Sequence, residues 1–218
     1  NKEDYEIMII HQKDNRSFNC GALKNIGFLI VREKYPDDYK NITLVFNDVD
    51  TMPFSKNFIP YQTDHGCVKH FYGFKFTLGG IVSITGQDFE KINGFPNFWA
   101  WGYEDNMLND RVKNMNMIID RSTFFPFADK NILHFYDGYL KQVNKQEFER
   151  YERGTREGIN SLFKVKYSVN NETGIIDITS FETGTDENKR LTHMHDLHNG
   201  TRPFVGRRRG GRGMSFFL

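Results

Sequence analysis

Apolar residues recur along the chain in patterns that predict alternating strands and helices. Residues 5–12 predict a strand. Residues 17–34 predict a helix with Ser17 as its N-cap, because their apolar residues fall on one helical stripe. Residues 42–50 predict a second buried strand. A strand, a helix and a strand in this order are typical of a parallel α/β unit.

The same patterns continue to about residue 181. We expect further elements in this order: strands over 68–76 and 78–85, helices over 87–95 and 101–117, a short strand over 117–121, an apolar segment over 131–135, a polar helix over 144–157, and a hairpin of 162–169 with 174–181. After residue 182 the periodicity fades and Gly and Arg accumulate, which predicts an extension or a flexible tail. The sequence therefore predicts one domain, 1–181, and a Gly/Arg-rich C-terminal extension, 182–218.

Composition mainly excludes classes of protein. The 218 residues include 29 Lys and Arg against 28 Asp and Glu, so no overall charge attracts nucleic acid or an anionic membrane. No apolar run reaches the roughly 18 residues of a membrane span, and the amino terminus does not resemble a signal peptide. Two cysteines are too few for a disulfide framework, which favours a soluble protein in a reducing compartment.

The extension contains two motifs of its own. The arginine- and glycine-rich stretch 202–212 resembles segments that bind RNA or acidic surfaces, but a solvated end or a strap docked on a partner protein fits equally well. The sequence therefore predicts no nucleic-acid binding except through this tail. His193, His195 and His198 could hold a metal, although a polar linker is the better interpretation without a second ligand cluster.

Asp48 and Asp50 raise the first question of chemistry, because they end a buried strand with two like charges. If the strand persists through them, both side chains point to the same face and repel each other. One interpretation is a polar strand end that is followed by a turn at Pro53. The other is that the pair faces a divalent cation at the end of an α/β strand, where open sheets place their sites.

Three further segments carry candidate chemistry. Gly79 and Gly80 would let a ligand approach the backbone closely. The run 92–106 ends in Glu104 and Asp105, which suit the first turn of a helix. His134 ends an apolar segment, where a lone histidine is more often a core residue than a metal ligand.

Taken together, the order of these motifs resembles the β-1,4-galactosyltransferase family. The residues that match the family pattern are Phe18, Asn19, Leu23, Asn25, Gly27, Phe28, Asp48, Val49, Asp50, Pro53, Gly79, Gly80, Ile92 through Asn97, Trp101, Gly102, Glu104, Asp105, His134, Gly158, Asn160, Ser161 and Leu162. The resemblance runs from about residue 5 to about residue 180, and its most specific part is the block from 92 to 105. It implies an α/β fold of the GT-A type, a mixed sheet flanked by helices, and a metal-dependent inverting glycosyltransferase.

The resemblance also implies roles for individual residues. Asp50 and His134 would bind Mn²⁺ or Mg²⁺, which would stabilise the diphosphate of a departing UDP. Asp105 would be the catalytic base, and Glu104 with Asn106 would hold the acceptor sugar. The donor would contact Phe18, Asp48, Thr77, Gly79, Gly80 and Trp101, the last on a mobile loop. Core packing is the alternative for Trp101 and the preferred interpretation for Trp99.

The departures from the family pattern all fall at this site. An upstream strand that contacts the nucleotide should precede residue 1, and Cys20 replaces an arginine that contacts the nucleotide. Asn131 replaces a methionine ligand of the metal, and an amide oxygen would still suit Mn²⁺ or Mg²⁺. Asn106 replaces a carboxylate, which weakens an acceptor contact. Thr77 replaces a tyrosine that restricts the donor, so an N-acetylhexosamine could be admitted.

The sequence therefore predicts a transferase that moves a hexose or N-acetylhexosamine from a UDP-sugar to a glycan or glycoprotein acceptor. The alternative is a non-catalytic module of the same fold with a structural or carbohydrate-binding role in a larger assembly. The family's disulfide cysteines align near Thr43 and Gln62, which favours the cytoplasm over the Golgi lumen.

Overall fold

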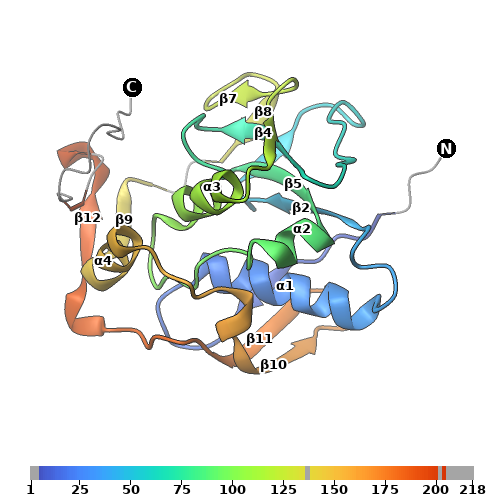
Figure 1. Ribbon diagram of the computed structural model, residues 1–218. Coiled ribbons are helices and arrows are strands. Elements are labelled where there is room, and N and C mark those ends of the chain that lie inside the picture. Colours follow the sequence, from blue (N-terminus) through green and yellow to red (C-terminus); the bar gives the residue numbers. More distant parts are fainter. Residues whose placement is uncertain (1–4, 136–137, 201–202, 205–218) are drawn as a thin grey trace.

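A central mixed sheet organises the chain, as the computed structural model shows (Figure 1). The structure describes residues 5–135, 138–200 and 203–204. The strand order is β2 (Thr43–Asn47), β5 (Ile81–Thr85), β4 (Cys67–Gly73) and β6 (Ile118–Asp120). The first three strands are antiparallel neighbours, whereas β6 and the short β7 (Phe125–Pro126) pair in parallel with β4. This arrangement confirms the predicted α/β class with a mixed sheet.

Three helices pack on the sheet through one apolar cluster. They are α1 (Cys20–Lys34), α2 (Gly86–Lys91) and α3 (Glu104–Asn114). The predicted cap of α1 is wrong by two residues, because the side chain of Asn19, not Ser17, accepts the backbone N–H of Ala22 at 2.9 Å. Among the described residues, no helix combines the length and apolar composition that crossing a bilayer requires.

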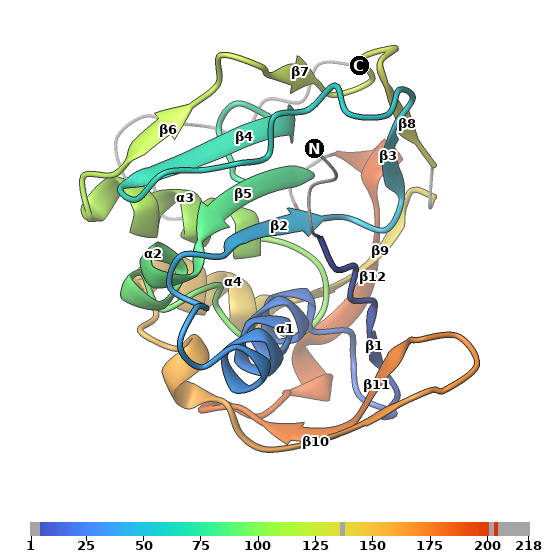
Figure 2. The same cartoon turned by 90° about the vertical axis from the view of Figure 1, so that its right-hand side faces the viewer.

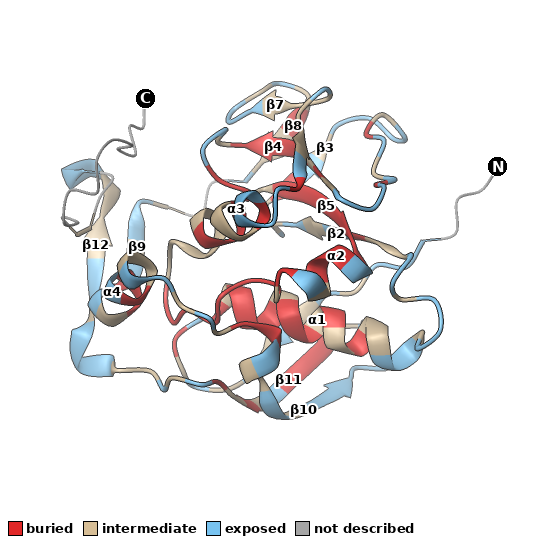
Figure 3. Ribbon diagram, viewed as in Figure 1, coloured by how far each residue is buried: buried red, intermediate tan, exposed pale blue. Residues whose placement is uncertain are grey.

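Helix α1 lies between two sheets, so it is buried on both sides (Figures 2 and 3). Phe28 faces the central sheet, while Ala22 and Ile26 face a second sheet. That sheet has the order β1 (Ile10–Gln12), β11 (Ile176–Glu182), β10 (Phe163–Val169). The hairpin of β10 and β11 was predicted from the sequence and is confirmed.

The predicted parallel unit of the first two strands is wrong. Strand β1 pairs in parallel with β11, and β2 lies in the other sheet. The strand predicted over 42–50 also ends at Asn47, and residues 49 and 50 form a turn before β3 (Thr51–Pro53). The turn therefore comes before Pro53, because β3 pairs with β8 (Ile132–His134) and includes that proline.

Residues 183–200, which follow β11, contain more regular structure than the predicted flexible tail. Strand β12 (Thr192–Asp196) pairs antiparallel with β9 (Leu140–Asn144), which precedes α4 (Lys145–Arg153). Interpreting the three histidines as a polar linker is wrong, because His193 and His195 lie in β12. Short 3₁₀ turns span Ile159–Ser161, Lys189–Leu191 and Leu197–Asn199. The domain boundary at 182 stays a prediction, and most of the stretch 202–212 lies outside the described residues.

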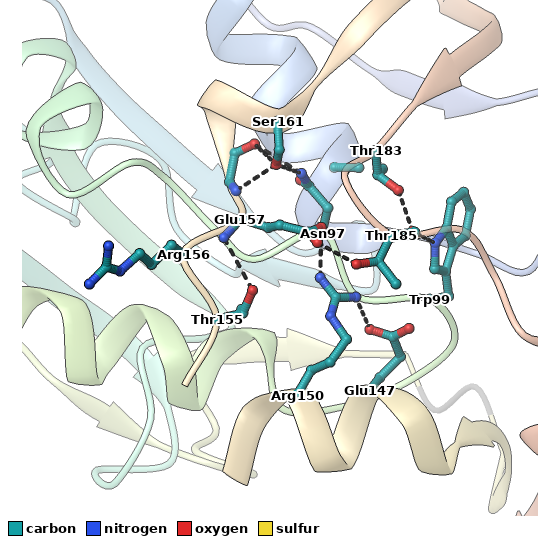
Figure 4. Close-up of polar contacts among 12 residues, drawn as sticks. Asn97, Trp99, Glu147, Arg150, Thr155, Arg156, Glu157, Ser161, Thr183 and Thr185 are labelled. Atoms are coloured by element: carbon teal, nitrogen blue, oxygen red, sulfur yellow. Dashed lines mark hydrogen bonds and ion pairs between the residues drawn. The ribbon is translucent and has the colours of Figure 1, made fainter. Parts of the chain in front are cut away.

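A polar network attaches the start of this extension to the domain (Figure 4). The indole N–H of Trp99 donates to the carbonyl of Thr185 at 3.0 Å, and the Thr185 hydroxyl bonds Glu157. Arg150 on α4 pairs with both Glu147 and Glu157. The segment after β11 therefore packs against α4 and the loop that carries Trp99.

Candidate active site

The predicted site residues gather at one end of the central sheet. Asn47 pairs with Ile81, so Asp48 follows the end of β2 where Gly79 and Gly80 precede β5. The backbone N–H of Asp48 donates to the carbonyl of Gly80 at 3.0 Å. The N–H of Leu78 donates to the carbonyl of Asp105 at 3.1 Å, which brings the start of α3 to the same place.

Asp48 and Asp50 do not share a face, because the turn at 49 and 50 separates them. One oxygen of Asp48, Oδ1, lies 2.9 Å from Nζ of Lys24, and the other, Oδ2, accepts the N–H of Gly80 at 3.2 Å. Lys24 therefore compensates the charge of Asp48.

Asp50 faces the predicted histidine ligand instead. Its Oδ2 lies 3.5 Å from Nε2 of His134, because the pairing of β3 with β8 places Thr51 opposite His134. The other ring nitrogen, Nδ1, lies 2.8 Å from the hydroxyl of Tyr72. An imidazole held at Nδ1 presents Nε2 toward Asp50, as histidine ligands of metals usually require.

These two side chains fit a hard divalent cation, but they form an incomplete ligand set. The described residues contain no group of three His, Cys, Asp or Glu side chains that could hold a metal. The amide nitrogen of Asn131, Nδ2, donates to Asp129 at 2.9 Å, which leaves the amide oxygen as the atom of ligand type. A carboxylate, an imidazole and an amide oxygen are a donor set suited to Mn²⁺ or Mg²⁺.

Glu104 and Asp105 form the first turn of α3, as predicted. Each carboxylate has a buried oxygen, Oε2 of Glu104 and Oδ1 of Asp105, with no hydrogen-bond partner among the described residues. Burial raises the pKa of Asp105 well above its usual value, which Lys24 opposes and the charges of Glu104 and Asp48 reinforce. Burial likewise raises the pKa of Glu104. Two neighbouring carboxylates that each keep a buried oxygen without a hydrogen-bond partner are typical of a functional site rather than of a helix cap.

Gly79 makes room for the candidate base. A Cβ atom at this position would lie 2.0 Å from Oδ2 of Asp105 and 2.5 Å from its Cγ. We predicted from the sequence that Gly79 lets a ligand approach the backbone. In the structure, the side chain of Asp105 packs against this glycine. Any larger residue at 79 would displace Asp105.

Lys24 and Tyr72 are site residues that sequence reasoning missed. Burial alone would lower the pKa of Lys24, but the nearby carboxylates of Asp48 and Asp105 outweigh burial and raise it well above its usual value. Lys24 follows Cys20 by four residues on α1, and that spacing was the available signal, since i and i+4 share a helix face. The sequence did not mark Tyr72 as a site residue, because it lies among other aromatic residues of a strand.

The remaining predicted donor residues, Phe18, Trp101 and Thr77, lie on three loops outside the strands of the sheet. The side chain of Phe18 is exposed, and its backbone carbonyl accepts the N–H of Ala100 at 2.9 Å. The N–H of Trp101 donates to the backbone carbonyl of Gln142 at 2.7 Å. Gly102 has a φ of +111°, which suits the sharp turn after Trp101. Thr77 is buried, and its hydroxyl donates to the carbonyl of Phe74 at 3.3 Å.

Other residues of the specific block hold the structure together. Trp99 is 1 % exposed and stacks on Phe181, which confirms its packing role. Asn25 and Asn97 are fully buried, and the amide N–H of Asn25 donates to the amide oxygen of Asn97 at 2.9 Å. Asn97 also donates to Ser161 at 3.0 Å (Figure 4). This buried network fixes the loop that leads to Trp101 and Asp105.

Comparisons with known proteins agree with this geometry. The family described as "N-terminal region of glycosyl transferase group 7" matches residues 1–62, and the one described as "N-terminal domain of galactosyltransferase" matches residues 67–137. Beta-1,4-galactosyltransferase 5 of Mus musculus is 31% identical over 175 residues, which are 76% of this chain and 44% of that protein. Beta-1,4-galactosyltransferase 1 of Homo sapiens is 31% identical over 180 residues, 73% of this chain and 42% of that protein. The chain thus spans less than half the length of these curated relatives.

Solved structures show the same fold. A variant of Drosophila beta-1,4-galactosyltransferase 7, in complex with manganese, UDP-Gal and xylobiose, superposes with a TM-score of 0.61. The sequence identity is 20%, and the match covers 84% of this chain and 82% of that one. The catalytic domain of the same Drosophila enzyme with xylobiose gives the same TM-score at 21% identity. These likenesses confirm the predicted GT-A type of fold.

Proposed function

The chain belongs to the β-1,4-galactosyltransferase family, and on this premise we propose that it transfers galactose or a related sugar from a UDP-sugar to a hydroxyl group of a glycan acceptor, with inversion. The observation that carries the proposal is the pair of carboxyl groups of Glu104 and Asp105 beside Asp48 and Gly79, each with one buried oxygen that has no hydrogen-bond partner among the described residues.

Asp105 acts as the base in this proposal. Its oxygen Oδ1 takes the proton of the acceptor hydroxyl while that hydroxyl oxygen forms a bond to the anomeric carbon. The bond from that carbon to the diphosphate breaks, and UDP leaves with the electron pair. Glu104 and Asn106 bind the acceptor sugar, and the adjacent carboxylate of Glu104 orients its hydroxyl toward Asp105.

Asp50, His134 and Asn131 are the residues that would hold Mn²⁺ or Mg²⁺. A divalent cation bound there would supply Lewis-acid stabilisation of the negative charge on the leaving diphosphate. Tyr72 supports this role of His134 by fixing the orientation of the ring.

The donor contacts Phe18, Asp48, Gly79, Gly80 and Trp101 in this proposal. The N–H of Ala100, the residue before Trp101, donates to the carbonyl of Phe18. Movement of the Trp101 loop over a donor would therefore also shift Phe18. Thr77 leaves the identity of the transferred sugar open to an N-acetylhexosamine.

Titration calorimetry of UDP with and without Mn²⁺ tests the donor site first. We expect binding that requires Mn²⁺ and that is lost in Asp50→Ala. Asp64→Ala is the matched control, because the exposed Asp64 precedes β4 at the opposite end of the sheet, and it should bind UDP like the wild type. Absence of Mn²⁺-dependent UDP binding in the wild type would refute the proposal for this chain and favour the non-catalytic module.

Turnover tests the reaction itself. UDP release from UDP-galactose and UDP-N-acetylgalactosamine should be measured with xylobiose and a panel of other glycans as acceptors. We expect acceptor-dependent release that is abolished in Asp105→Asn. UDP binding with no turnover for any pair, and glycan binding in its place, would favour a carbohydrate-binding module.

Cys20 and Cys67 are both free thiols, and we propose a reducing compartment for the protein.

A further inference from the structure

Lys24 is a cation enclosed at the donor side of the site. Its side chain is 14% exposed, and Nζ lies 2.9 Å from Oδ1 of Asp48 and 4.9 Å from the centre of the Phe95 ring. An ammonium group that pairs with a carboxylate and lies over an aromatic ring is held in place before any ligand arrives.

The carboxylates around Lys24 outnumber it. Asp48, Glu104 and Asp105 all lie near enough to interact electrostatically with one another, and Lys24 interacts with each of them. A nucleoside diphosphate brings more negative charge to this place. Without a cation from the protein, repulsion from three carboxylates would oppose its binding.

The position of Lys24 relates it to the arginine that this chain lacks. Cys20 stands where the family pattern has an arginine that contacts the nucleotide, and Lys24 lies one helical turn later on the same face of α1. A thiol whose pKa is raised by burial is neutral and gives the donor no charge. This face of α1 therefore carries its positive charge at Lys24, four residues after the position at which the family pattern has an arginine.

We propose that Lys24 binds the diphosphate of the donor and replaces the missing arginine at position 20. The inference rests on the proposed function, since it needs a nucleoside diphosphate as ligand. In the absence of the donor, Asp48 holds the ammonium group in position, and its second oxygen is anchored by the N–H of Gly80. On binding, Lys24 donates to a phosphate oxygen as a point charge.

The test compares UDP with uridine, which lacks the phosphates. Both are titrated in the presence of Mn²⁺ into the wild type, Lys24→Met and Lys24→Arg. We expect Lys24→Met to weaken UDP binding at least about tenfold and to leave uridine binding unchanged, because only UDP carries the charge that Lys24 recognises. Lys24→Arg should retain most of the UDP affinity. Lys34→Met is the matched control, since Lys34 lies at the far end of α1 and pairs with Glu6.

A rescue variant keeps the proposal falsifiable if Lys24→Met also disturbs folding. Cys20→Arg in the Lys24→Met background should restore UDP affinity, because it returns a cation to the same helix face. Equal loss of UDP and uridine in Lys24→Met, or unchanged UDP affinity, would overturn the role of Lys24 while leaving the proposed function in place. Failure of the wild type to bind UDP at all would overturn both.

Discussion

Replacing the candidate base by an amide should inactivate the protein and stabilise its fold. Asp105 has a buried oxygen with no hydrogen-bond partner in the described part of the chain, and it shares its surroundings with the carboxylates of Glu104 and Asp48 and with the cation Lys24. Asp105→Asn keeps the shape and removes the charge. A lost general base typically costs a hundredfold to ten-thousandfold in rate, so transfer should fall by roughly that factor.

The gain in stability follows from the raised pKa of Asp105. An unpaired buried polar group costs about 1–3 kcal/mol, and the buried amide would retain part of that cost, which leaves a net gain of about 1 kcal/mol. For a chain of this size, the melting temperature would rise by about 2–4 °C. Ionised Asp105 lowers stability as the pH rises from the unfolded pKa, near 4, through the raised folded pKa. The gain should therefore be full above the folded pKa and absent below about pH 4.

Thermal melts at pH 7.5 and pH 4, beside UDP release at pH 7.5, measure both effects. Asp120→Asn is a control of opposite sign, because the N–H of Ser122 donates to Asp120 and lowers its pKa. That variant should melt slightly lower at pH 7.5. A melting temperature of Asp105→Asn below that of the wild type at pH 7.5, or a shift of equal size at both pH values, would refute the reasoning.

Three further variants test the surroundings of the site. Gly79→Ala should reduce transfer at least about tenfold with the fold retained, because its Cβ would displace Asp105; wild-type activity would contradict this packing argument. Tyr72→Phe should weaken Mn²⁺ binding about tenfold, measured by titration calorimetry, because His134 loses its partner at Nδ1; unchanged affinity would show that the ring is held by other contacts. Asn97→Ala should lower the free energy of unfolding by about 2–4 kcal/mol in urea titrations, since it leaves buried partners unpaired; a loss under 0.5 kcal/mol would mean that the network tolerates the gap.

The sequence predicted those features that depend on local pattern or on specific motifs. The helix predicted over 17–34 is confirmed from Cys20 to Lys34, and the acidic first turn of α3 and the hairpin near the C-terminus are confirmed as well. Each of these features is determined by residues close together in the chain. The family motif also identified residues that meet in space, such as Asp50 and His134. Their roles in binding and catalysis stay predictions until they are measured.

The errors concern partners that are distant in the chain. Strand β1 pairs with β11, which lies 166 residues away at His11 and Asp177, and no local pattern specifies that choice. Strand β12 was missed for the same reason. It is polar and, among the described strands, pairs only with β9, so its sequence shows no alternation of apolar and polar residues that would indicate a strand. Lys24 was missed because its significance comes from Asp48, which only the fold brings near.

The pairing of β12 with β9 has a consequence for how the protein can be shortened. A chain cut after the predicted boundary at 182 would expose the edge of β9, and an open strand edge is a template for aggregation. The same strand supplies the carbonyl of Gln142 that holds the N–H of Trp101, so the cut would also loosen the loop that carries Trp101, a residue of the proposed donor site. Poor solubility and altered donor affinity of such a truncated protein would then have one cause, the loss of a neighbouring strand.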